Sequence, residues 1–338
     1  MKILKNYSLS RLNTFGIGAF AKFFAEVGSE EELKGLFADP VFKENKKFFL
    51  GGGSNILFTK NFDGMVIFNQ IKGIEILEEE KDETAVIKSM SGVIWHDLVT
   101  FTTERGYWGL ENLSLIPGTV GAAPMQNIGA YGAELREVLQ SVEAFNIATG
   151  IKRIFSREEC ELGYRDSIFK NKLKNQYFIS AITLKLHKIE KKNLTYKVLS
   201  DYLDKNKINV RSPKDISDAV SSIRKSKLPD PRLIGNAGSF FKNVFVTKDK
   251  FEDLVKIYPD MPHFKEDEEV KIPAGWLIER CGWKGKRVGN AGVHEKQALV
   301  LVNHGGATGE EIVELANKII ASVKEKFGLK LVPEVNIV

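Results

Sequence analysis

The chain has 338 residues and a mass of 37.9 kDa, which is too long for one ordinary core and predicts two or three domains. Apolar residues make up 43% and charged residues 28%, so the chain can bury enough surface to fold, and disordered and fibrous classes are excluded. The net charge of +5 comes from 49 Lys and Arg against 44 Asp and Glu, which are mostly interleaved; this indicates a mixed solvated surface and argues against a nucleic-acid partner.

Neither membrane insertion nor export is indicated. The apolar run Ala298–Val302 is far shorter than the roughly 20 residues that span a bilayer. Met1–Thr14 lacks the continuous apolar core of a signal peptide, so we expect a soluble, cytoplasmic protein without a membrane partner. Two distant cysteines, Cys160 and Cys281, exclude a disulfide framework, and five dispersed histidines predict no tightly bound metal.

The first elements have a β-α-β rhythm. Phe20–Val27 is typical of a strand, and the capping box Ser29–Glu32 predicts a short helix toward Phe37. Two further strands are predicted at Phe48–Leu50 and Met65–Phe68.

The middle of the chain predicts an antiparallel sheet. Ile74–Leu77 and Thr84–Ser89 flank a charged turn as a hairpin, and Trp95–Arg105 is predicted to be a helix that ends at Gly106. Three further strands are expected, at Val142–Asn146, Ile151–Phe155 and Phe178–Leu186.

A new α/β unit is predicted after a helix that begins at Ser212-Pro213 and runs to about Ser226. The prolines in Leu228–Pro231 break the chain there, and we place a domain boundary at this point. The expected elements of the unit are helices at Thr247–Tyr258, Ala274–Cys281 and Thr308–Gly328, a buried strand at Ala298–Val302, and an extended tail at Lys330–Val338 that returns to a sheet.

Gly51–Asn55 is the first of two glycine-rich loops. Consecutive glycines let backbone N–H groups turn inward and form an anion-binding nest. Without Gly-Lys-Ser/Thr the loop is not a Walker A motif, and Ile56 stands where a dinucleotide fingerprint needs its third glycine. A phosphate cradle and a plain tight turn both remain open.

The second loop, Leu115–Gly132, has few side chains that would block access to its backbone. A flat heteroaromatic ligand such as a flavin could lie against it, with Thr119, Gln126 and Asn127 as side-chain partners. The alternative is a compact loop packed on itself.

Three polar residues stand in unusual settings. Arg165 follows a short helix that a Ser156/Glu159 capping box predicts, and surface ion pairing is its alternative role. Ser239 precedes two aromatic residues that would hold it in an apolar setting, but no Gly-x-Ser-x-Gly elbow surrounds it. Glu334 interrupts an apolar terminal strand, as either an edge carboxylate or a buried functional one.

Read together, the motifs resemble the flavin-dependent UDP-N-acetylenolpyruvoylglucosamine reductases, in their longer form. The matching segments run in order across nearly the whole chain: Asn13–Gly16, Gly51–Asn55, Ile116–Gly132, Tyr164–Lys170, Leu194–Tyr196, Lys227–Pro229, Gly235–Asn243, Gly275–Glu279, Gln297–Val300 and Pro333–Val335. Two positions depart from the family pattern: Val244 replaces a proline, and Asn336 replaces an arginine whose loss could remove a charged contact near the flavin.

The resemblance implies an α+β fold: an FAD-binding fold of the vanillyl-alcohol-oxidase type made of two α+β domains, plus a third α/β substrate-binding domain. The expected boundaries are 1–70 with 329–338, 71–228, and 229–328. It also implies non-covalent FAD, NADPH as co-substrate, and reduction of UDP-N-acetylglucosamine enolpyruvate to UDP-N-acetylmuramate for peptidoglycan. A monomer is favoured.

The resemblance also assigns site residues. The catalytic set is Ser239 as proton donor, with Arg165 and Glu334 stabilising an enolate. The expected FAD-binding set is Gly51, Gly52, Gly53, Ser54, Asn55, Ile116, Pro117, Gly118, Thr119, Gln126, Asn127 and Gly129, and the expected substrate-binding set is Tyr164, Tyr196, Lys227, Asn243 and Gln297.

Two other functions fit parts of the pattern. A hydroxy-acid or sugar oxidase on the same fold would explain the glycine loops, but not Ser239 together with Glu334. A non-enzymatic nucleotide-binding module would explain phosphate-cradling loops without a flavin. An oxidase in its reduced form consumes oxygen quickly, whereas a reductase does so slowly. A nucleotide-binding module without a flavin would lack the yellow colour of bound FAD.

Overall fold

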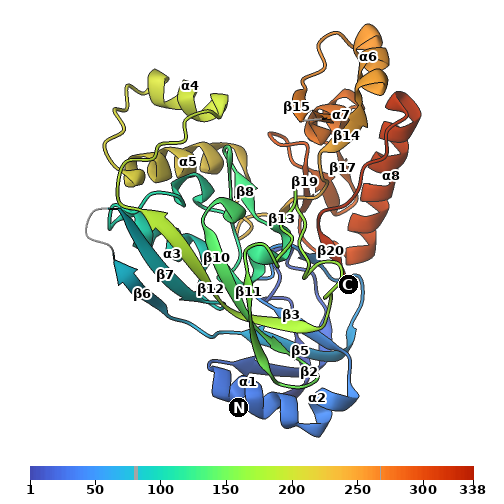
Figure 1. The fold of residues 1–338 in the computed structure, drawn as a ribbon. Helices are drawn as coiled ribbons and strands as arrows, with labels where there is room; N and C mark the ends of the chain where they lie inside the picture. Colours follow the sequence, from blue (N-terminus) through green and yellow to red (C-terminus); the bar gives the residue numbers. More distant parts are fainter. Residues whose placement is uncertain (80–82, 267) are drawn as a thin grey trace. The chain divides into compact units, whose positions relative to one another are not determined.

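The computed structural model describes residues 1–79, 83–266 and 268–338, and the chain divides into two compact units (Figure 1). Unit 1 comprises Met1–Tyr7, Ala21–Gly52 and Asp63–Ser226. Unit 2 comprises Ser8–Phe20, Gly53–Phe62 and Lys227–Val338. The first glycine loop therefore begins in one unit and continues in the other.

A four-stranded sheet with two helices forms one part of unit 1. Its strand order is β1 (Ile3–Ser8), β2 (Phe20–Val27), β5 (Phe62–Asn69) and β3 (Lys47–Leu50), and β3 pairs with β5 in parallel. The helices are α1 (Glu30–Ala38) and α2 (Pro40–Glu44). Leu33 and Leu36 of α1 pack with Met65 and Ile67 of the sheet, so the apolar face of the helix is buried there.

A five-stranded sheet forms the second part of unit 1, and all its strand pairs are antiparallel. The order is β11 (Lys152–Ser156), β10 (Leu139–Asn146), β12 (Tyr177–His187), β7 (Thr84–Met90) and β6 (Ile74–Glu79). Helix α3 (Trp95–Thr103) packs on its core, and the Trp95 Nε1 donates to the Leu113 carbonyl at 2.9 Å. This bond ties the helix to the start of the second glycine loop.

The second glycine loop contains only short elements. They are η1 (Glu111–Leu113), η2 (Val120–Ala122), η3 (Pro124–Gln126), β8 (Gly129–Ala130), β9 (Ala133–Glu134) and η4 (Leu135–Glu137). Helices α4 (Lys197–Lys205) and α5 (Pro213–Lys227) share a separate apolar cluster, in which Trp108 is buried.

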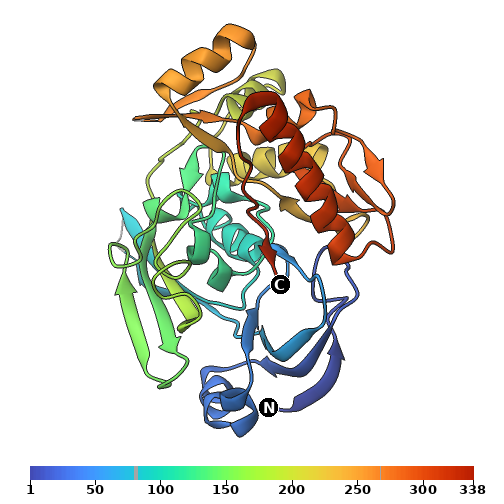
Figure 2. The same cartoon turned by 90° about the vertical axis from the view of Figure 1, so that its right-hand side faces the viewer.

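Unit 2 has two antiparallel sheets. One has the order β13 (Gly235–Ser239), β19 (Val300–Asn303), β18 (Ala291–Val293) and β17 (Arg287–Val288); the other has β14 (Val244–Thr247), β16 (Glu269–Ile272) and β15 (Phe264–Glu266). The helices are α6 (Lys248–Ile257), α7 (Ala274–Arg280) and α8 (Gly309–Phe327). Figure 2 shows the tail running back beside α8, and its strand β20 (Asn336–Ile337) pairs in parallel with β4 (Ile56–Leu57).

Most predicted elements are confirmed, and two predictions are wrong. The capping bonds between Ser156 and Glu159 form, at 2.8 and 3.2 Å, but only turns follow because Glu161 adopts a left-handed φ of 45°. The third part was expected to be α/β. Its sheets are antiparallel, so it too is α+β.

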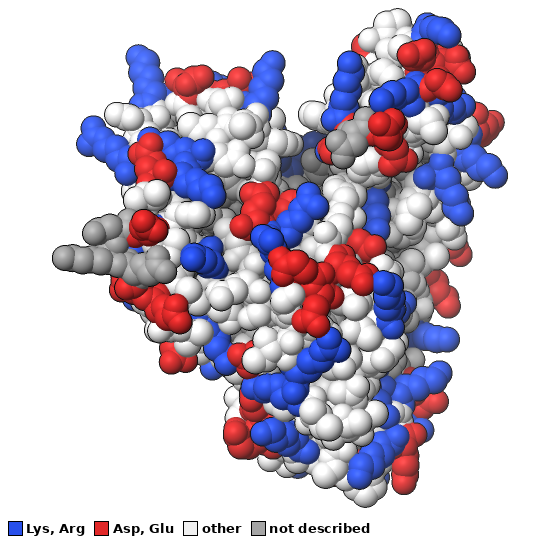
Figure 3. Space-filling model, viewed as in Figure 1, with Lys and Arg blue, Asp and Glu red and all other residues white. Residues whose placement is uncertain are grey.

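The charged surface is mixed, as the interleaved sequence predicts. On the face drawn in Figure 3, Lys and Arg alternate with Asp and Glu, and no single sign dominates. Within the described residues, none of the helices combines the length and the apolar character that crossing a bilayer requires.

Two helical glycines predict opposite effects of the same substitution. A Cβ on Gly309, at the start of α8, would collide with the Phe58 carbonyl, whereas a Cβ on Gly35 in α1 meets nothing within 4 Å. We expect Gly309→Ala to lower the free energy of unfolding by about 1–3 kcal/mol and Gly35→Ala to raise it by about 0.5–1 kcal/mol, measured by urea titration. Equal effects of the two changes would contradict the predicted contact of Gly309.

Candidate active site

The two glycine loops meet within unit 1. A Cβ on Gly52 would lie 3.0 Å from the Gly118 Cα, and a Cβ on Gly51 would collide with the Thr119 Oγ1. The missing side chains therefore allow two stretches of backbone to approach each other closely. Sequence patterns alone did not predict this pairing.

The paired loops leave backbone open to a ligand. Gly52 and Pro117 are exposed, and Gly118 is half-buried, whereas Thr119 is buried with 7% of its surface accessible. A flat group could lie on this strip and bond to its peptide groups, so the residues present fit a flavin nucleotide. Among the residues that the structure describes, no three His, Cys, Asp or Glu side chains gather in a way that could hold a metal ion.

The continuation of the first loop is held in place within unit 2. Gly53 has a φ of 62°, and a Cβ there would collide with the Leu12 carbonyl. The Thr14 N–H donates to the Gly53 carbonyl at 3.0 Å, and the Thr14 hydroxyl donates to the Asn236 carbonyl at 2.6 Å. The segment near Asn13, which the resemblance matched without assigning a role, thus positions the loop.

Asn336 contacts the end of the same loop. Its backbone N–H and its side-chain Nδ2 both donate to the Asn55 carbonyl at 3.1 Å. The predicted site does not include Asn336, because an arginine is usual at this position in the family. In the structure it fixes the backbone of Asn55, a predicted FAD-binding residue.

Backbone bonds fix the start of the second loop. The Trp95 N–H donates to the Gly118 carbonyl at 3.0 Å, and the Val120 N–H donates to the Val93 carbonyl at 2.9 Å. A Cβ on Gly121 would collide with Ser91. The loop is therefore bonded to the β7–α3 connection and is not packed only on itself.

His96 supports the second loop where its backbone is strained. The Leu115 N–H donates to the His96 Nδ1 at 3.1 Å, and Leu115 has a left-handed φ of 57°. Burial, the largest cause, lowers the pKa of His96, which favours the neutral ring that can accept this bond. No motif in the sequence indicates this role of His96.

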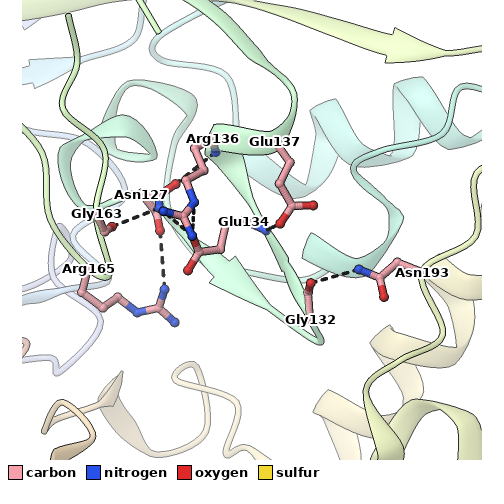
Figure 4. A network of polar contacts seen from close by, with 8 residues as sticks. All are labelled: Asn127, Gly132, Glu134, Arg136, Glu137, Gly163, Arg165 and Asn193. Carbon is pink, nitrogen blue, oxygen red and sulfur yellow. Dashed lines mark hydrogen bonds and ion pairs between the residues drawn. The ribbon is translucent and has the colours of Figure 1, made fainter. Parts of the chain in front are cut away.

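Asn127 is the buried centre of a polar network in the second loop (Figure 4). Its Nδ2 donates to Glu134 Oε2 at 2.9 Å and to the Gly163 carbonyl at 3.0 Å, and its Oδ1 accepts from the Arg136 N–H at 3.0 Å. The side chain is 0% exposed. Because these bonds occupy the amide, any contact of Asn127 with a cofactor would come from its backbone.

Arg165 lies at the far end of the second loop. Its Nη2 donates to the Gly129 carbonyl at 2.8 Å. Figure 4 shows the weaker contact of 3.5 Å that joins its Nη1 to the Asn127 carbonyl. Its guanidinium lies 5.3 Å from the Tyr164 ring centre, and its own carbonyl accepts from Lys170 Nζ at 3.1 Å. The expected cation is thus bonded to the predicted cofactor loop.

Tyr196 also approaches this loop. Its ring meets Tyr131 edge-to-face, with 5.3 Å between ring centres, while 41% of Tyr196 remains exposed. Burial raises the pKa of Tyr131. An exposed ring with one supporting neighbour is well suited to cover a ligand.

Ser239 and Glu334 lie on neighbouring stretches of unit 2. The Glu334 N–H donates to the Phe240 carbonyl at 2.8 Å, and Phe241 forms an antiparallel bridge with Pro333. The expectation of an apolar setting for Ser239 is wrong: Phe240 and Phe241 are buried, but Ser239 itself, the last residue of β13, is exposed. Glu334 is half-buried.

The remaining predicted substrate residues are also in unit 2. Asn243 Oδ1 accepts from the Ala274 N–H at 3.1 Å at the start of α7, and Gln297 Oε1 accepts from the Leu299 N–H at 3.3 Å. These bonds orient both amides. Lys227 is exposed at the end of α5.

Comparisons with known proteins agree with this geometry. A family model described as an FAD binding domain matches residues 21–154, and one described as the UDP-N-acetylenolpyruvoylglucosamine reductase C-terminal domain matches residues 230–338. Reductases of that name from Flavobacterium johnsoniae and Amoebophilus asiaticus are 49% and 50% identical, each with 100% of both sequences covered. The solved reductase of Thermus caldophilus has a TM-score of 0.65 at 24% identity over 99% of this chain and 98% of that chain. The predicted α+β FAD-binding fold is confirmed.

The Asn127 network predicts a reciprocal substitution. Asn127→Asp places a second carboxylate against Glu134, so we expect it to lower the free energy of unfolding by about 2–4 kcal/mol. Adding Glu134→Gln restores a donor opposite the new acceptor and should recover part of that loss. A double-mutant cycle from urea unfolding measures this coupling. Strictly additive effects would show that the two side chains do not interact.

His96 predicts a pH dependence with a definite sign. Because its pKa is lowered in the folded state, the unfolded chain binds more protons as the pH falls below about 6.5, and stability is lost in that direction. His96→Asn keeps an acceptor for Leu115 without a titrating ring. The stability of the unsubstituted protein relative to this variant should therefore fall as the pH is lowered from about 7.5 to about 5. Parallel stability curves would contradict the prediction.

Proposed function

Because the chain belongs to the UDP-N-acetylenolpyruvoylglucosamine reductase family, we propose a role for each of its site residues in that reaction. The chain is an FAD-dependent oxidoreductase that uses NADPH to reduce UDP-N-acetylglucosamine enolpyruvate to UDP-N-acetylmuramate in peptidoglycan synthesis. One observation supports the proposed roles of the residues: the two glycine-rich loops lie against each other, and Arg165 donates a hydrogen bond to the Gly129 carbonyl of the second loop.

FAD is held without a covalent bond, mainly by backbone. Residues 51–55 and 116–119 offer peptide groups, Gln126 offers its amide, and Asn127 and Gly129 contribute backbone. When bound, FAD accepts hydride from NADPH and delivers hydride to the substrate. His96 Nδ1 is occupied by Leu115, and Cys160 is buried with its pKa raised by burial to about 12, which argues against either as a covalent attachment point.

Arg165, Glu334 and Ser239 act on the substrate. Hydride addition to the terminal carbon of an enolpyruvyl ether places negative charge on the adjacent carbon and its carboxylate. Arg165 offers a permanent positive charge, and Glu334, when it carries a proton, donates a hydrogen bond to the same group. The exposed Ser239 hydroxyl then gives its proton to carbon, which it can do because an enolate is a strong base.

The nucleotide part of the substrate is held by other side chains. Lys227 binds the diphosphate, Asn243 and Gln297 present amides oriented by their backbone bonds, and Tyr164 and Tyr196 cover the ligand.

We further propose that the chain works as three functional parts, 1–70 with 329–338, 71–228, and 229–328. We place the enzyme in the cytoplasm, where NADPH and nucleotide sugars are found, and we expect it to be a monomer.

Separate half-reactions test this function. The yellow protein is reduced anaerobically with NADPH, and the UDP-enolpyruvyl sugar is then added while flavin absorbance is recorded. We expect the sugar to reoxidise the flavin and oxygen alone to do so slowly. Fast oxygen consumption without reoxidation by the sugar would indicate an oxidase and would overturn the assignment.

Ser239→Ala should affect only the second half-reaction. The hydroxyl is needed after the nicotinamide has left, so reduction by NADPH should stay nearly unchanged while reoxidation by the sugar slows by about 10²–10³. Ser322→Ala, at a half-buried position of α8 where the hydroxyl donates only to the Lys318 carbonyl of the same helix, is the matched control and should change neither rate. An equal loss in both half-reactions would remove Ser239 from the role of proton donor.

A further inference from the structure

Arg224 lies on the face of α5 that contacts the second glycine loop. Ser217, two turns earlier on the same helix, hydrogen-bonds Ser114 through their hydroxyls at 2.7 Å. Residues seven apart lie on the same side of a helix. Tyr131 packs against the apolar cluster to which Ile216, Val220 and Ile223 of this helix belong. Helix α5 therefore approaches both ends of the loop, and Arg224 faces it.

The guanidinium of Arg224 is incompletely bonded. Its Nε is buried and has no hydrogen-bond partner among the described residues. A buried N–H without an acceptor costs about 1–3 kcal/mol, and more on a charged group. A folded chain retains such a group at a cost in stability that a bound acceptor would remove.

The electrostatic surroundings of Arg224 increase this cost. Burial is the largest cause that lowers the pKa of Arg224, and the positive charge of Arg165 acts in the same direction, while Tyr131 opposes it. Two guanidiniums thus influence each other beside the second loop. Arg165 donates to carbonyls of that loop, whereas the Arg224 Nε has no such acceptor.

We propose that Arg224 is a further ligand-binding residue of the active site, which donates to a planar pair of acceptor atoms presented next to the second glycine loop. Two sources offer this chemistry, namely the carbonyl-bearing edge of the flavin ring and the carboxylate of the enolpyruvyl group. A guanidinium matches either edge with two parallel N–H bonds, whereas an ammonium cannot. The identity of these two ligands rests on the proposed function.

The test compares three variants in two titrations. Arg224→Met removes the charge and the donors at similar length, Arg224→Lys keeps the charge without the planar fork, and Lys225→Met removes the same charge from the exposed neighbouring residue. Apoprotein is titrated with FAD, and the FAD-loaded protein is titrated with the UDP-enolpyruvyl sugar. Thermal unfolding of each apoprotein is recorded in parallel.

Arg224→Met should weaken one of the two affinities by about 10- to 100-fold, Arg224→Lys should recover only part of it, and Lys225→Met should change neither. A loss in the FAD titration identifies the flavin edge, and a loss in the sugar titration identifies the carboxylate. The apoprotein of Arg224→Met should be at least as stable as the unsubstituted one, because a buried charged donor without an acceptor has been removed.

Unchanged affinities, or a lower thermal stability with a matching loss in both titrations, would overturn the proposal and make Arg224 a structural residue. The FAD titration does not depend on turnover. A chain that binds FAD through Arg224 but does not reduce the sugar would therefore refute the reductase assignment without refuting this site.

Discussion

The close approach of Gly51 and Gly52 to Gly118 and Thr119 is the constraint on which the cofactor half of the site depends. Peptide backbones can come this near only where no Cβ intervenes, and a single added methyl group at either glycine would push the loops apart. The approach joins a strand end of one sheet to a loop anchored on the other. The two glycine-rich loops therefore hold each other in place and together form one fixed surface of peptide groups.

Fixing that surface requires strained backbone. Leu115, Asn127, Tyr131 and Arg165 all have left-handed φ, a conformation that costs non-glycine residues about 1 kcal/mol or more. Specific bonds offset this strain: His96 accepts from Leu115, Glu134 and Gly163 hold Asn127, and Gly129 accepts from Arg165. The loop is thus prepared for a ligand before the ligand binds, which lowers the entropy lost on binding.

Much of the fold could be predicted because its signals are local. The caps at Ser29 and Thr308 and the periodicity of α8 each depend on neighbouring residues, and these elements are confirmed. The capping box at Ser156 shows the limit of local signals, since its bonds form and no helix follows. Propagation of a helix depends on the next turn, where Glu161 leaves the helical region.

The site was harder to predict, because its supporting residues act across long stretches of chain. The resemblance supplied Arg165, Ser239 and Glu334, but nothing in the sequence linked His96 to Leu115 or Asn336 to Asn55. Asn127 was expected to bind the cofactor through its amide, and that amide instead holds the loop together.

The polar side chains of the proposed site are therefore of two kinds: those whose hydrogen bonds the protein itself completes, and those that it leaves without a partner. Asn243 and Gln297 use one end of the amide to cap backbone, which fixes the direction of the other end. The Arg224 Nε is buried without such a bond. A chain loses stability when it buries a charged donor that has no acceptor. A ligand that supplies the acceptor restores this stability when it binds. Such groups are therefore expected at binding sites, where selection favoured binding over stability.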